Sequence, residues 1–324
     1  MRDSPQILTE RPIGESWRGD LLAQSEHGRL AEELRPFSSP SLSDPDFDEQ
    51  RAIEICGGIC RGVLGDFAPA LLLLSALERQ RVQALLAYTH TLFDFARQHE
   101  LAGERLAQIN RWEFTLETVL SGEPVGQPIF VRMAREQRRR AWPGKALLDD
   151  LSACARRRAI RPRPATPEQA DADAERLGRA VASVLLGQDP PGEVSGFLGA
   201  LIRLRTLQVL GTEVGRNRWP VPVSELPDDR IARMARVEGR PDPVQLLEVV
   251  HGECARLRLR LMRAPRGLVE LPAGYRRAAV FCLLAALRIL TGLEDGGPEV
   301  LRTPPQIGLG DRLALLARAR WFRV

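Results

Sequence analysis

The sequence predicts an all-α protein, and three observations support that prediction. The chain of 324 residues is 44% hydrophobic but only 5% aromatic, a balance that favours helices over sheets. From about residue 46 onward, apolar residues recur at helical spacing between short Gly or Pro breaks. No stretch alternates between apolar and polar residues for as long as a strand would. The length and apolar content are ample for a buried core.

Residues 1–45 are predicted to form a disordered tail ahead of one helical domain at 46–324. The tail is rich in Ser, Pro, Glu and Arg, has no sustained periodicity, and shows no apolar run typical of a signal peptide. The most apolar stretches, Ala68–Leu77 and Ala278–Leu287, are about half as long as a membrane span. We therefore expect buried helices, no transmembrane segment, and a cytoplasmic protein with at most peripheral membrane contact.

The first helices are expected over 47–61, 64–77 and 78–99. Cys56 and Cys60 lie four residues apart in the first of them, a spacing that suits a metal. No cluster of His or Cys follows at ligand spacing, and the five cysteines include no CxxC pair. We therefore expect reduced thiols and no metal at this position.

Two basic runs, REQRRR at 135–140 and RRRAIRPR at 156–163, lie in the middle of the chain. Only Trp142 is available nearby for base stacking, so we interpret the runs as solvated surface and expect no nucleic-acid partner. The net charge of +4 agrees with that interpretation. Thr166 and Pro167 then predict an N-cap and first turn for a helix to about Leu186.

The segment Gly199–Pro222 reads GALIRLRTLQVLGTEVGRNRWPVP and organises the rest of the chain. Leucines at helical spacing, with no Pro before Pro220, predict a long core helix that runs into a loop. The side of this helix opposite the leucines carries Arg205, Val209 and Glu213. Two more helices are expected, over 242–262, with Asp242 as the cap and Pro243 in the first turn, and over 274–293.

This segment resembles the second aspartate-rich helix of the squalene/phytoene synthase family, roughly ALQLTNxxxDVxxDxxxGRxYLP. The leading AL and the closing Pro are kept, and Arg218 keeps the arginine of GR. Glu213 falls on the second aspartate and Val209 on the first. The resemblance covers about 47–321 and is most similar to the bacterial branch linked to hopanoid and squalene formation.

The stretch at 86–97 resembles the family's first motif, which reads roughly YAFARxxDDxxD. Tyr88 takes its Phe position and His90 its Arg position, while Phe93, Asp94 and Arg97 take the three aspartates. The next helix and turn also follow the family, at positions expected to be structural: Trp112, Gly122, Pro124, Pro128 and Phe130.

The resemblance implies a single-domain isoprenoid-synthase-type helical bundle around a central cavity. In the family, the two aspartate-rich helices hold Mg²⁺ against the diphosphate of a prenyl substrate. Phe93, Arg97 and Val209 are not metal ligands, which leaves Asp94 and Glu213 as the remnants of the metal and diphosphate site. No cofactor is expected, except Mg²⁺ on those two residues if the protein is active.

Two arginines, Arg97 and Arg205, lie on the helix faces that carry the metal-binding aspartates in the family; we call these faces the former metal face. Two hypotheses follow. Arg97 and Arg205, with His90 and Arg218 nearby, would bind an anion directly, because a guanidinium matches phosphate geometry. Alternatively, Arg97 pairs with Glu213, or Arg205 with Asp94, and the ion pairs close the site. His90 is interpreted as a satisfied histidine of the core or cavity and not as a catalytic base.

The predicted function is that of a non-catalytic or altered homologue that binds an isoprenoid, a prenyl diphosphate or a partner enzyme of the isoprenoid pathway. The alternative is an active head-to-head prenyl transferase that uses farnesyl or geranylgeranyl diphosphate with an incomplete Mg²⁺ site. A third hypothesis is an assembly or scaffold protein.

Overall fold

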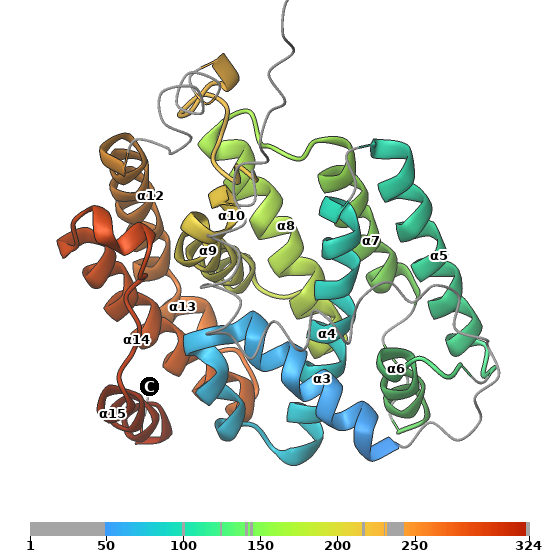
Figure 1. Cartoon of the computed structure of the whole chain (residues 1–324). Coiled ribbons are helices and arrows are strands. Elements are labelled where there is room, and N and C mark those ends of the chain that lie inside the picture. The colour runs from blue at the N-terminus through green and yellow to red at the C-terminus, as the bar shows by residue number, and fades with distance from the viewer. Residues whose placement is uncertain are drawn as a thin grey trace, which may run out of the picture. The chain divides into compact units, whose positions relative to one another are not determined.

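A computed structural model of the chain describes residues 49–98, 101–123, 125–139, 142, 145–215, 218–229, 231 and 243–321. These residues contain helices and no strand, which confirms the all-α fold class (Figure 1). They all belong to one compact unit that spans 42–324. The predicted tail at 1–45 lies outside the described residues and stays a prediction.

Most of the described helices follow one another with short connections, and neighbours in sequence are often neighbours in space (Figure 1). In the first half, α4, α7 and α8 pack together and α9 packs on α8; in the second half, α12 and α14 pack on α9. The elements and their bounds are α3 (Glu49–Leu64), η1 (Gly65–Leu73), α4 (Ala76–Gln98), α5 (Ala102–Leu120), α6 (Pro128–Arg139), α7 (Lys145–Ile160), α8 (Pro167–Leu186), α9 (Gly192–Gln208), α10 (Leu210–Gly215), α12 (Pro243–Arg263), α13 (Pro265–Leu268), α14 (Ala273–Asp295), η2 (Pro298–Leu301) and α15 (Leu309–Trp321).

Local capping chemistry sets where α8 begins. The side chain of Thr166 accepts a hydrogen bond from the Gln169 amide at 3.3 Å, and Pro167 is the first helical residue. The helix ends at Leu186, as predicted, and Gly187 follows with a φ of 74°. Pro243 likewise opens α12, whereas its proposed cap, Asp242, lies outside the described residues.

The α-helix predicted over 64–77 is wrong in type and extent. The chain forms the 3₁₀ helix η1 instead, because Pro69 has no N–H and its ring disfavours an α-helical turn. Ser75 then begins α4 through a capping box: its hydroxyl accepts from the Glu78 amide at 3.3 Å, and its own amide donates to the Glu78 carboxylate at 2.9 Å.

The long helix predicted from Gly199 is also divided in the structure. It begins earlier, as α9 at Gly192, and bends at Val209, whose φ and ψ are −100° and 4°, before α10. Contacts from outside the helix hold both sides of this bend. The Gln208 amide donates to Asp66 at 3.1 Å, and Gly211 lies against the carbonyl of Leu301 so closely that a Cβ would overlap it.

Helices α8 and α9 approach each other through two glycines. A Cβ at Gly199 would lie 2.8 Å from the Cα and the amide nitrogen of Glu175, and one at Gly178 would lie 2.9 Å from the Gly199 amide nitrogen. Neither position leaves room for a side chain against the facing backbone. This close approach fixes α9, which leads into the second motif, against α8.

Aromatic side chains form the core between α4, α5 and α6. The ring of Trp112 lies 5.9 Å from that of Tyr88 and 4.4 Å from that of Phe130. All three side chains are buried, so Trp112 and Phe130 are structural, as predicted. Tyr88, which takes the Phe position of the first motif, points into this core.

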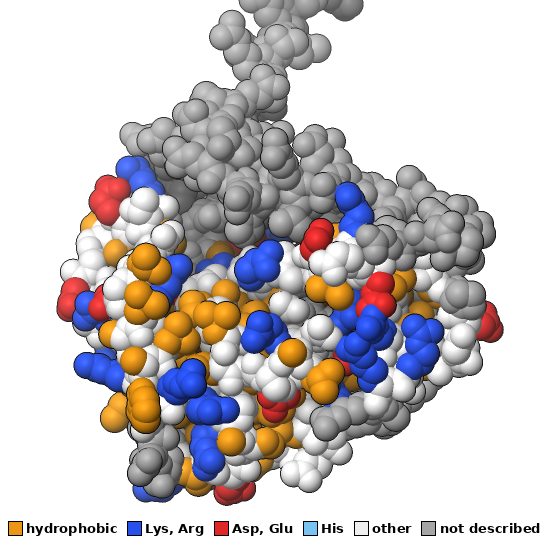
Figure 2. Space-filling view, turned by 90° about the horizontal axis from the view of Figure 1, so that it is seen from below, with side chains coloured by type: hydrophobic (Ala, Val, Ile, Leu, Met, Phe, Trp, Pro, Cys, Tyr) orange, Lys and Arg blue, Asp and Glu red, His pale blue; other side chains and the backbone are white. Residues whose placement is uncertain are grey.

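One surface of the protein combines apolar and basic side chains. Figure 2, seen from below, shows hydrophobic side chains interspersed with Lys and Arg. Helix α15 lies on the lower side of Figure 1 and packs on η1 and α14. More than half of each of five large apolar side chains on η1, α4 and α15 is exposed: Leu72, Leu77, Leu309, Leu313 and Trp321.

One segment, Glu49–Leu73, is long and apolar enough to cross a membrane by length and composition, a test that core helices of globular proteins also pass. Here the segment is divided between α3 and η1. Helix α3 packs on α4 and α6, and η1 packs on α14 and α15. The length test therefore carries little weight for this chain.

Replacing Gly199 should destabilise the fold through the α8–α9 contact. We expect Gly199→Ala to lower the free energy of unfolding by about 2 kcal/mol, because the new methyl group overpacks a backbone contact. Gly196→Ala is the matched control on the same helix, since a Cβ there meets nothing within 4 Å. It should raise stability by about 0.5–1 kcal/mol through helix propensity. Urea denaturation checks both variants, and equal effects would contradict the packing argument.

Candidate functional site

The remnant of the first motif, Asp94, is engaged from both sides on its own helix. His90 Nε2 lies 3.3 Å from Asp94 Oδ2, and Arg97 Nη2 lies 2.8 Å from Asp94 Oδ1. Arg97 also donates through Nε to the carbonyl of Phe93 at 3.2 Å. Residues one turn before and after Asp94 share its helix face, which explains these contacts. Both carboxylate oxygens therefore already face a donor.

The remnant of the second motif, Glu213, lies on the short helix α10 just after the bend. Its carboxylate is 3.6 Å from Arg218 Nη1, and its carbonyl accepts a hydrogen bond from the Arg218 amide at 2.8 Å. The Glu213 side chain is only 13% exposed, compared with 38% for Arg218. Glu213 thus faces an arginine that follows it in the chain.

The described residues do not fit the family's magnesium site. They contain no group of three or more His, Cys, Asp and Glu side chains placed to hold a metal ion. Mg²⁺ requires anionic oxygen ligands, and the two candidate carboxylates, Asp94 and Glu213, are already beside cations. Arg97, which replaces the last aspartate of the first motif, adds a positive charge that repels a metal.

The ion pairs expected across the site do not form. Arg97 pairs with Asp94 on its own helix and not with Glu213. Arg205 does not reach Asp94; it donates to the carbonyls of Val63 and Gly62, each at 3.1 Å. Carbonyls in the last turn of α3 have no partners within the helix, so a guanidinium satisfies them well. Arg205 therefore fastens α9 to α3.

Sequence reasoning missed Arg158, which lies on α7. The run at 156–163 was expected to be solvated, and Arg156 and Arg157 are indeed exposed. Arg158 is different, because it follows the buried residues Leu151 and Ala155 at spacings of seven and three, on the same helical stripe. The spacing of Arg158 from Leu151 and Ala155 is the sequence feature that indicates its burial. It is easily missed because Arg158 lies within a run of arginines.

Charges from four other helices act on Arg158. Burial, together with the nearby cations Arg97 and Arg203, lowers its pKa to about 10. Asp173 on α8 and Glu213 on α10 act in the opposite direction. These five residues, which we call the Arg158 cluster, join both former metal motifs with α7, α8 and α9.

Arg158 forms no hydrogen bond with another described residue, but the charges of Asp173 and Glu213 partly compensate its own. By contrast, Arg97 is bound to Asp94, and Arg203 is buried and bound to Glu253 at 2.5 Å. A charged guanidinium on a buried stripe normally needs a partner.

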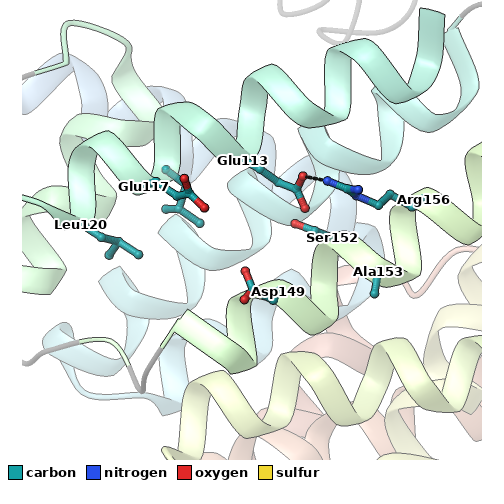
Figure 3. A pocket seen from close by; sticks show the side chains of 8 residues that line it. Glu113, Glu117, Leu120, Asp149, Ser152, Ala153 and Arg156 are labelled. Atoms are coloured by element: carbon teal, nitrogen blue, oxygen red, sulfur yellow. Dashed lines mark hydrogen bonds and ion pairs between the residues drawn. The ribbon is translucent and has the colours of Figure 1, made fainter. Parts of the chain in front are cut away.

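A pocket of about 350 Å³ lies between α5 and α7 (Figure 3). Carboxylates from both helices face it, and the Arg156 guanidinium is bonded to Glu113. Because Arg156 and Arg158 are two residues apart, they project about 200° apart around α7. The pocket therefore lies away from the Arg158 cluster, and its acidic lining would repel a diphosphate. It is lined by Glu113, Leu116, Glu117, Leu120, Asp149, Ser152, Ala153 and Arg156.

Comparisons with known proteins identify the fold. The sequence matches no protein-family model and no curated protein. Its structure is similar to a ligand-bound dehydrosqualene synthase, with a TM-score of 0.63 and 14% identity over 84% of this chain and 96% of the other. It is also similar to squalene synthase HpnC from Alicyclobacillus acidocaldarius, with a TM-score of 0.56 and 18% identity over 80% and 97%. A ligand complex of the protein TcSQS gives a TM-score of 0.62 and 14% identity over 83% and 86%.

The chain therefore has the fold of squalene and dehydrosqualene synthases, and it spans nearly the full length of these structures. This confirms the isoprenoid-synthase-type bundle that the sequence resemblance implies. At 14–18% identity, the likeness establishes the fold alone.

The cysteine thiols should be inert in the folded protein. Burial raises the pKa of Cys56 and Cys60 from 9.0 to about 12, so neither supplies the thiolate that a metal or an electrophile needs. We expect both to react with a disulfide reagent at pH 8 at least tenfold faster in urea than in buffer. Since only the unfolded thiols ionise between pH 9.0 and about 12, stability should also fall as pH rises through that window. Rapid labelling of either residue in the native protein would contradict this prediction.

Proposed function

We propose that the chain is a divergent member of the squalene/phytoene synthase family that binds a prenyl diphosphate without Mg²⁺-dependent ionisation. The observation that carries the proposal is the position of Asp94 between His90 and Arg97. In the family, metal bound by such a carboxylate neutralises the departing diphosphate. Here a metal would have to displace a guanidinium at 2.8 Å and then remain beside its charge.

The shared fold supports the choice of ligand class. Its solved relatives include a squalene synthase and a dehydrosqualene synthase, and we infer that this chain retains a place for an isoprenoid among its helices. A protein that holds a prenyl diphosphate without cleaving it can protect the ligand or deliver it to a partner enzyme of the same pathway. Scaffold proteins of the same fold would bind no such ligand.

Pyrophosphate release separates the proposed function from an active transferase. With purified protein, farnesyl diphosphate and Mg²⁺, we expect no release above background, while a squalene synthase assayed in parallel releases pyrophosphate. Equilibrium binding of farnesyl diphosphate should nevertheless be measurable. Mg²⁺-dependent release that Glu213→Ala abolishes would overturn the proposal and assign catalysis to Asp94 and Glu213. Folded protein that neither releases pyrophosphate nor binds the ligand would favour a scaffold.

We also propose peripheral membrane contact through α15. Leu309, Leu313 and Trp321 follow one another at intervals of four and eight residues, so they share one helix face, and each is more than half exposed. Arg318 and Arg320 in the last turn of α15 would attract anionic lipid headgroups. Apolar anchors with flanking arginines are typical of helices that lie in a membrane interface.

Vesicle sedimentation tests the α15 surface. The double variant Leu313→Ser/Trp321→Ser should weaken binding to vesicles that contain phosphatidylserine by at least about tenfold, because two buried apolar side chains are each worth roughly 1.5–3 kcal/mol. Phe114→Ser is a control on the distant helix α5, where Phe114 is 70% exposed. Equal loss in both variants, or no binding of the unaltered protein, would refute the proposal.

A further inference from the structure

The pocket between α5 and α7 combines an acidic edge with an apolar wall and a buried hydroxyl group (Figure 3). We propose that it binds a small primary amine, with the ammonium group on Asp149 and Ser152 and the hydrocarbon part along α5. Neither former metal motif contributes a residue to this pocket. Its acidic lining repels the diphosphate of the proposed function, so the amine site is a second and separate one.

Asp149 is the carboxylate that the pocket offers to a cation. Glu113, on the facing helix, is already bonded to the guanidinium of Arg156, so a cationic group already lies against this wall (Figure 3). Asp149 forms no ion pair with any residue that the structure describes. Because Asp149 is exposed, water can solvate it, and its charge alone would not define a site. The neighbouring groups in the pocket supply the selectivity.

Ser152 distinguishes this pocket from an acidic patch on the surface. It lines the pocket although the residue is only 2% exposed, and its side chain lies between those of Glu113 and Asp149 (Figure 3). A ligand that enters far enough to reach Ser152 leaves most of its water behind. The electrostatic attraction to Asp149 is stronger in such a place than on an open surface.

A second hydroxyl group lies behind Ser152. Tyr88 on α4 is fully buried, and its hydroxyl approaches Ser152 but completes no hydrogen bond with a described residue. Burial raises the pKa of Tyr88, so the phenol stays neutral. A hydroxyl oxygen accepts two hydrogen bonds, so Ser152 can accept one from Tyr88 and one from an ammonium group. A bound amine would thus complete a chain of contacts that is unfinished without it.

The lining favours a primary amine over a metal ion or a quaternary amine. The described residues contain no group of three or more His, Cys, Asp and Glu side chains placed to hold a metal ion. An ammonium group has three N–H donors and no acceptor, which suits a carboxylate and a hydroxyl oxygen, whereas a quaternary amine has no donor. Leu116 and Leu120, one turn apart on α5, offer an apolar wall to a hydrocarbon chain. The volume of about 350 Å³ limits the ligand to a small one.

Titration with 1-aminobutane, 1-butanol and tetramethylammonium tests the site, with binding followed through the amide NMR signals of α5 and α7. We expect saturable binding of aminobutane and at least about tenfold weaker binding of the other two probes, because butanol lacks the charge and tetramethylammonium lacks the N–H donors. Asp149→Asn should weaken aminobutane binding by about tenfold. Asp150→Asn is the matched control, since Asp150 is the exposed next residue and does not line the pocket. It should leave the affinity unchanged.

Arg156→Gln gives a readout in the opposite direction. Removal of the guanidinium leaves Glu113 as a second carboxylate for the ligand, so aminobutane should bind at least about threefold more tightly. A variant that folds poorly does not gain affinity. Arg157→Gln is the matched control, because Arg157 is exposed, follows directly in the chain and contacts Cys154 Sγ at 3.4 Å. It should change the affinity by less than about twofold.

The contrary outcomes are distinct. Equal affinity of Asp149→Asn and Asp150→Asn, or equal binding of tetramethylammonium and aminobutane, would mean a general attraction to surface charge and overturn the site. Mg²⁺ that displaces aminobutane at matched ionic strength would also overturn it, as would the absence of saturable binding to the unaltered protein. None of these outcomes bears on the binding of farnesyl diphosphate, so the amine site and the proposed function stand or fail independently.

Discussion

The buried carboxylate of Asp66 joins parts of the fold that are far apart in sequence. It is only 6% exposed and accepts hydrogen bonds from the Gln208 amide at 3.1 Å, the Ile307 backbone amide at 3.2 Å and the Arg312 guanidinium at 2.8 Å. A buried carboxylate is tolerated only when such partners satisfy it. One side chain on η1 thereby fixes the end of α9, the segment before α15, and α15 itself.

This constraint also shapes the former second metal motif. Gln208, held by Asp66, immediately precedes the bend at Val209, and Arg205 one turn earlier is anchored on the end of α3. Burial lowers the pKa of Arg205, and the nearby charge of Asp66 partly offsets that effect. The last turn of α9 thus serves the fold, and Glu213 is carried on the separate helix α10. Arg205, on the former metal face, therefore links α9 to α3 through hydrogen bonds and has a structural role.

The helix starts that were predicted correctly depend on neighbouring residues, whereas the ion pairs predicted across the site depended on distances that the sequence does not give. Thr166 and Pro167 specify a helix start within four residues, and Ser75 and Glu78 form a capping box that the same rules would have located. The partners of Arg205 are backbone carbonyls about 140 positions away, which no side-chain pattern reveals. Arg97 instead pairs with Asp94, three residues before it on the same helix, which the i,i+3 spacing could have indicated.

In both motifs, an arginine neutralises the acidic residue that remains. A carboxylate attracts a diphosphate only through a bound cation and repels it when that cation is absent. Once Arg97 replaces a ligand, Asp94 becomes its partner, and the same guanidinium neutralises the charge that would otherwise repel an anion. Arg218 does the same for Glu213. Both remnant carboxylates are therefore paired with arginines, and neither keeps the free anionic oxygens that Mg²⁺ requires.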